Sequence, residues 1–216
     1  MPVERGLARI WLVTAAVLSV AVALVSFRFA AVPFQVWPSV DPGIRGVIER
    51  APLQALIHMI IAPVALLVGP FQFFASIRAR RPALHRLMGR IYVAACLVAG
   101  TAALATAPYA SGGPIAGLGF GTLAFLWIAS TLGAWRAAMA RKFDLHRLLM
   151  RFSYALTFSA VTLRLQIPLG QIFFGFHSYA ALSVWLAYTC WMPNAIVVAL
   201  YSMVEALRRP QMPLAR

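Results

Sequence analysis

The sequence is poor in the residues from which soluble enzymes build catalytic sites. Only five of its 216 residues are acidic, against nineteen lysines and arginines. No paired carboxylates, nucleophile triad, phosphate-binding loop or HExxH motif occurs, which argues against hydrolytic and phosphoryl-transfer chemistry. If the chain is an enzyme, its chemistry therefore comes from a cofactor.

Cysteine is equally scarce. Cys96 and Cys190 both lie inside apolar segments and show no CxxC spacing. Neither a disulfide framework nor a cysteine-based metal site is expected from two such residues. Both are predicted to be packing residues.

Long hydrophobic runs dominate what is present. Hydrophobic residues make up 62% of the chain, so its solvent is lipid and its basic character does not require a nucleic-acid partner. A membrane segment must bond its backbone internally, which predicts a single all-α integral membrane domain over residues 1–216. Runs of about 20 apolar residues predict six transmembrane helices. They span approximately 10–31, 53–75, 87–108, 115–135, 149–169 and 178–206.

Fifteen of the nineteen basic residues fall into four short segments that alternate with these runs. Lys and Arg accumulate on the cytoplasmic side of short-looped membrane proteins. All four segments, and with them both termini, are therefore predicted to be cytoplasmic. The segments contain Arg5 and Arg9; Arg78, Arg80, Arg81, Arg86 and Arg90; Arg136, Arg141, Lys142, Arg147 and Arg151; and Arg208, Arg209 and Arg216.

Two of the basic segments carry nearly the same motif. Residues 84–90 read LHRLMGR and residues 145–151 read LHRLLMR, which places His85 and His146 61 positions apart. Both copies enter helices that run in the same direction, so the repeat is parallel and implies a pseudo-twofold axis along the membrane normal. The two histidines are therefore expected to face each other at one depth.

The other two histidines are His58 and His177, near the outer ends of the second and sixth predicted spans. Four histidines on four helices, two per leaflet, suit two haem b groups, because imidazole is an axial ligand of haem iron and bundle cores hold such ligands. This hypothesis takes all four histidines as iron ligands. Small faces on these helices also allow close packing without a cofactor, and His-Arg pairs at helix starts also contact lipid headgroups.

Arg164 lies deep in the fifth predicted span, roughly 27 Å along the helix from His146. A charged residue within a span marks a functional site by default, here a clamp for a haem propionate at the outer site. Arg90 and Arg151 would hold the inner propionates. Snorkelling of Arg164 to outer headgroups is the alternative.

The motifs together resemble those of bacterial membrane proteins that carry domain of unknown function 2306. The resemblance covers approximately residues 50–207. It rests on Gly69 to Phe73, Arg78 to Pro82, His85-Arg86, Gly89-Arg90, Tyr92, His146-Arg147, Met150-Arg151, Thr162 to Arg164, Trp191 and Asn194. Met88 and Leu149 stand where that family usually has tryptophan. The resemblance implies a multi-pass protein of the bacterial inner membrane, and the family carries no settled activity.

Three functions follow as hypotheses. The first is a two-haem b-type cytochrome that transfers electrons. The second is a non-catalytic subunit, scaffold or assembly factor whose basic face binds anionic membrane lipids or a partner such as a respiratory complex. The third is a quinone- or anion-binding or transport protein that uses Arg164, Gln166 and His177. No acidic residue lies in the middle of a span, which argues against ion-coupled transport.

Overall fold

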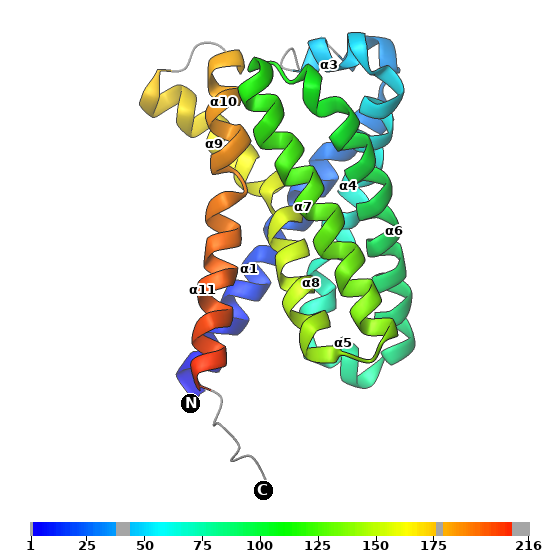
Figure 1. The fold of residues 1–216 in the computed structure, drawn as a ribbon, viewed down its shortest axis with the longest axis vertical. Helices are drawn as coiled ribbons and strands as arrows, with labels where there is room; N and C mark the ends of the chain where they lie inside the picture. The colour runs from blue at the N-terminus through cyan, green and yellow to red at the C-terminus, as the bar shows by residue number, and fades with distance from the viewer. Residues whose placement is uncertain (1, 38–43, 176–178, 209–216) are drawn as a thin grey trace, which may run out of the picture.

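The computed structural model describes residues 2–37, 44–175 and 179–208, and these residues form helices and turns with no strand (Figure 1). The α-helices are α1 (Pro2–Ser26), α3 (Arg45–Arg50), α4 (Pro52–Val68), α5 (Ala75–Arg80), α6 (Pro82–Thr106), α7 (Gly113–Met139), α8 (Phe143–Thr157), α9 (Ser159–Phe174), α10 (Tyr179–Thr189) and α11 (Met192–Arg208). Short 3₁₀ helices connect them: η1 (Phe27–Ala31), η2 (Phe34–Val36), η4 (Pro70–Phe73) and η5 (Ala107–Tyr109).

Five stretches of the described chain are long and apolar enough to cross a membrane: residues 9–31, 52–73, 82–109, 113–139 and 182–208. The all-α membrane fold predicted from the sequence is therefore confirmed. The start of α1 and the end of α11 lie at the same end of the bundle as α5 (Figure 1). We call this the basic end, because it carries α5, the start of α6 and the turn between α7 and α8. The other end carries α3.

The predicted fifth span, 149–169, is not one continuous helix. It is divided between α8 and α9, which meet at Phe158. Hydroxyl groups bond to the backbone on both sides of this junction: Thr157 Oγ1 donates to Ser153 O and Ser159 Oγ donates to Leu156 O. Such back-bonding competes with the helical ladder and bends helices. Hydropathy alone does not register this effect, because the segment stays apolar throughout.

The last apolar stretch is also interrupted. α10 ends at Thr189 and α11 begins at Met192, with Pro193 in its first turn. A proline there is compatible with a helix start but not with a helix interior, because it lacks the N–H group and clashes with the preceding turn. After the continuous helix α7, the chain therefore forms two broken helices, α8–α9 and α10–α11.

The core of the bundle lies between α4, α6, α7 and α8. α6 packs closely on α4 and α7, and α8 packs on α7 and α11, whereas α6 and α8 meet mainly through side chains. α1 lies against α4, and α10 against α7. Small residues allow the close contacts: a Cβ built on Gly100 would lie only 2.7 Å from Ile128 Cγ1. The resulting arrangement leaves α6 and α8 facing each other across larger side chains.

Helix α4 ends at Val68, directly before Gly69 and Pro70. A Cβ on Gly69 would lie 2.8 Å from ring atoms of Tyr154, so glycine permits this close approach. Pro70 then opens η4 and turns the chain inward. As a result Gln72, in the middle of η4, is only 7% exposed.

Candidate functional site

His146 is held at the start of α8 by the tight turn that follows α7. Arg141 adopts a left-handed conformation with φ 56°, and Lys142 N–H donates to Ala137 O, which closes the end of α7 in a Schellman-type turn. One turn into α8, Nδ1 of His146 lies 2.9 Å from the carbonyl oxygen of Ala134 on α7. Because a carbonyl only accepts, Nδ1 is the donor in this bond, and in a neutral imidazole that leaves a lone pair on Nε2.

His85 occupies the corresponding place at the start of α6. Pro82 opens the helix in the position where its missing N–H is not needed, and His85 follows half-buried one turn later. His85 and His146 are near enough for their charges to interact. The structure thus brings together the two histidines that the repeated motif predicted to face each other.

The ring of His85 differs from that of His146 in one respect. Its Nδ1 atom is buried, and among the described residues no group forms a hydrogen bond with it. Next to it along the same face of α6 is Gly89, where a Cβ would lie 3.3 Å from Oε1 of Gln72. Nε2 of Gln72 is likewise buried and has no hydrogen-bond partner in the described part of the chain.

His58 lies on α4 at the other level of the bundle. Its Nδ1 is 3.0 Å from the carbonyl oxygen of Ala99 on α6, so it shows the same pattern as His146. Ala99 is fourteen residues beyond His85, which is roughly 21 Å along a helix. His177, its predicted counterpart, lies outside the described residues.

The predicted arginines fall into different environments. Arg164 is exposed, donates from Nη1 to Ala160 O at 3.0 Å, and is near enough to His58 for their charges to interact. Arg90 is exposed on α6. Arg151 forms an ion pair with Glu205, and its guanidinium lies 5.1 Å from the ring centroid of Tyr201.

Arg151 already has a carboxylate partner on α11, and both side chains of the pair are partly exposed. Its expected role toward an inner haem propionate stays a prediction. Its partner Glu205 lies 54 positions away in the sequence. The only sequence signal for this ion pair was that one of the few acidic residues lies in the last apolar stretch.

A buried network of hydroxyl groups joins α6, α7 and α8 between the two histidine levels. Tyr92 OH lies 2.8 Å from both Ser153 Oγ and Thr157 Oγ1. Thr131 Oγ1 lies 2.7 Å from Ser153 Oγ, and Trp127 Nε1 donates to Thr157 Oγ1 at 2.8 Å. Sequence analysis named Tyr92 only among the residues on which the family resemblance rests. The spacing of Ser153 and Thr157, one turn apart on an apolar helix, was the available signal for the network.

The polar residues near the two helix breaks are occupied by each other. Gln166 Nε2 donates to Thr189 O, and Thr189 Oγ1 donates to Gln166 Oε1, both at 3.1 Å. Asn194 Nδ2 donates to Ala155 O and to Thr162 Oγ1. Gln166, considered above as part of an outer anion or quinone site, therefore ties α9 to α10.

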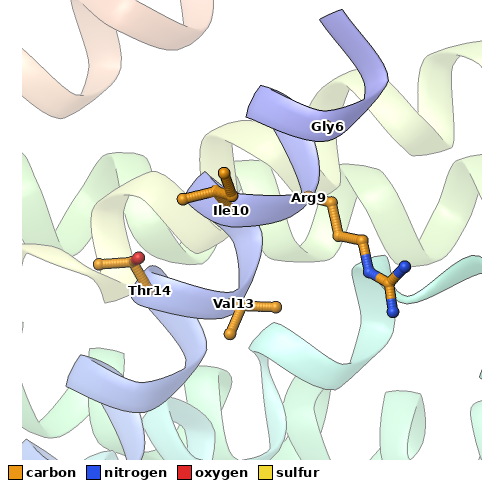
Figure 2. A pocket seen from close by; sticks show the side chains of 5 residues that line it. All are labelled: Gly6, Arg9, Ile10, Val13 and Thr14. Atoms are coloured by element: carbon orange, nitrogen blue, oxygen red, sulfur yellow. The ribbon is translucent and has the colours of Figure 1, made fainter. Parts of the chain in front are cut away.

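A shallow depression of about 410 Å³ lies along α1. It is lined by Gly6, Arg9, Ile10, Val13 and Thr14 (Figure 2). Ile10 and Thr14 lie on one side of the helix, and Arg9 extends away on the other (Figure 2). Among the described residues that line it only Arg9 is charged, and these residues do not form the set of convergent polar groups that marks a ligand site.

Comparison with known proteins identifies the family but no activity. Within the described residues no cluster of three or more His, Cys, Asp or Glu side chains is placed to hold a metal ion. No curated protein and no solved structure matches the chain. The model of one family, described as predicted membrane protein (DUF2306), matches residues 55–202. The chain therefore belongs to the DUF2306 family of predicted membrane proteins.

Proposed function

We propose that this multi-pass membrane protein is a b-type electron-transfer protein that binds a haem between His85 and His146. The observation that carries the proposal is the pair itself. Two histidines from copies of one motif stand on α6 and α8, near enough for their charges to interact, while these two helices pack much more closely on α7 than on each other. Haem iron takes axial imidazoles from facing helices of a bundle.

The hydrogen bonds of the imidazoles support this function. Metal-binding histidines usually donate one ring N–H to a carbonyl or carboxylate, which fixes the ring and leaves the other nitrogen for the metal. His146 bonds in this way to Ala134, and His58 to Ala99. A bis-imidazole iron site needs only two such protein ligands, so a larger cluster of donors is not required.

The opposite end of the bundle supports a second site less directly. His58 supplies one imidazole there, and Arg164 supplies a nearby positive charge for an anionic substituent of the cofactor. At the basic end Arg90 would play that part. When bound, haem would supply one-electron transfer; the protein would hold, orient and shield it from water.

The test is the visible spectrum of the purified full-length protein from haem-replete cells. The wild type should show a Soret band and, on reduction, a sharpened alpha band. His85→Ala and His146→Ala should each remove the same haem component of the spectrum. His58→Ala should remove a different haem component. Tyr92→Phe, which changes no imidazole, should keep the whole spectrum. A colourless, folded wild-type protein would refute the proposal.

A second candidate function is supported by the cations of the basic end. Their side chains are exposed on α5, at the start of α6 and around the turn between α7 and α8: Arg78, Arg80, Arg81, Arg86, Arg136, Arg141 and Lys142. Such a surface attracts anionic lipid headgroups, as expected of a scaffold or assembly subunit. Native mass spectrometry should then show retained anionic lipid that is lost when Arg78, Arg80 and Arg81 are replaced by glutamine.

A further inference from the structure

The two unpartnered polar atoms near α6 belong to one place in the fold. Gln72 comes from η4 and His85 from the first turns of α6, and Gly89 lies beside the Gln72 amide. Nε2 of Gln72 and Nδ1 of His85 are both buried and have no hydrogen-bond partner among the described residues. A buried donor left without an acceptor is destabilising, so two such groups in one place point to a ligand that accepts hydrogen bonds.

The contrast with the other histidines identifies what is missing. In His146 and His58 the Nδ1 position is occupied by a backbone carbonyl from a neighbouring helix. In His85 the equivalent carbonyl is absent from the described structure, because η4 and not a regular helix lies beside it. The missing partner is therefore an acceptor that resembles a carbonyl group. The two groups without a partner among the described residues, the Gln72 amide and the His85 imidazole in its neutral form, carry no charge.

The surroundings are aromatic and near the lipid. The rings of Phe71 in η4 and of Phe74, the residue after η4, stack with centroids 6.0 Å apart, and the Phe73 ring packs against Tyr154 with centroids 5.2 Å apart. Phe71 and Phe74 are only half-buried, so apolar ring surface is exposed beside the two polar groups at the end of a predicted membrane segment. The charges of Arg78 and Arg86 reach His85, but both side chains are exposed. The aromatic rings beside the two buried polar groups favour a flat, neutral, lipid-soluble molecule over a phosphate.

We propose that the basic end of the bundle binds the head group of a membrane quinone, with Gln72 Nε2–H and His85 Nδ1–H donating to quinone carbonyl oxygen. The quinone site extends the proposed function, and any role of this site in electron transfer rests on that function. Quinone binding itself requires no haem, because His85 would use Nε2 for iron and Nδ1 for the quinone. The site lies at the other end of the bundle from Gln166 and His58.

The experiment titrates the full-length protein in lipid nanodiscs with decylubiquinone and with menadione, using isothermal titration calorimetry. Gln72→Met keeps the length of the side chain and removes the amide, and its matched control is Gln54→Met on α4. We expect saturable binding by the wild type and the control. Loss of one buried hydrogen bond should weaken binding about tenfold in Gln72→Met.

A stability measurement separates a ligand-binding role from a structural one. Replacing an unpartnered polar group by an apolar one of similar shape should leave the quinone-free protein as stable as the wild type, so its melting temperature should not fall. The inference would be overturned by a lack of saturable quinone binding to the wild type. It would also be overturned if Gln72→Met bound quinone as tightly as the wild type, or if only phospholipid competed for the site.

Spectra of the same samples keep the two proposals apart. Quinone binding that depends on Gln72 in a colourless protein supports the quinone site and refutes the haem site. A haem spectrum without quinone binding supports the haem site and refutes the quinone site.

Discussion

Removal of one hydroxyl group should show how much the buried network contributes to stability. Tyr92 is fully buried, and its OH makes hydrogen bonds to Ser153 and Thr157. Side-chain hydrogen bonds within membranes contribute about 0.6 kcal/mol on average and at most about 1.7 kcal/mol. Tyr92→Phe loses two of them, while Ser153 and Thr157 keep other partners. We therefore expect it to lower the free energy of unfolding by about 1–2 kcal/mol.

The assay is reversible unfolding in mixed micelles of dodecyl maltoside and sodium dodecyl sulfate, followed by far-ultraviolet circular dichroism. Tyr188→Phe is the matched control, because the Tyr188 hydroxyl donates a single bond to Ile115 O in a more exposed setting, so it should cost about half as much. A double-mutant cycle of Tyr92→Phe with Thr157→Val isolates the shared bond. A loss near zero would show that the network is not formed, and a loss above about 4 kcal/mol would show that the reasoning from hydrogen bonds alone is wrong.

Three further substitutions probe the packing of the bundle. Gly100→Ala places a methyl group against Ile128 and should destabilise by about 1–3 kcal/mol in the same unfolding assay; an unchanged value would mean that α6 and α7 lie further apart. Arg151→Gln removes the ion pair with Glu205, which is partly exposed, so the loss should be at most about 1 kcal/mol and should shrink at high salt. Asn194→Leu leaves backbone carbonyls at the helix breaks unsatisfied and should lower the thermal midpoint measured by circular dichroism, whereas Leu at Gln54 should not.

The sequence predicted the parts of this molecule that repeat or that depend on hydropathy. Long apolar runs predicted the membrane helices, and the shared motif around His85 and His146 predicted their proximity, because two equivalent helix starts in a parallel repeat reach the same depth. These features follow from local composition. Predicting these features does not require knowing which side chains contact each other in the folded protein.

Long-range polar pairing could not be predicted in this way. Arg151 and Glu205 pair across 54 positions. Tyr154, which follows His146 at nearly the distance at which Tyr92 follows His85, bonds to Ser19 on α1 and not to the network around Tyr92. The break at Phe158 was missed for a different reason: hydroxyl back-bonding changes helix geometry without changing hydropathy.

The two broken helices give the second half of the chain an upper and a lower pair of short segments. α8 and α11 are joined by Arg151 and Glu205, and α9 and α10 by Gln166 and Thr189. Asn194 lies where the pairs meet and bonds to both α8 and α9. The Asn194 side chain therefore joins the two helix breaks to each other, while the uninterrupted helix α7 packs on both α8 and α10 and connects the two pairs.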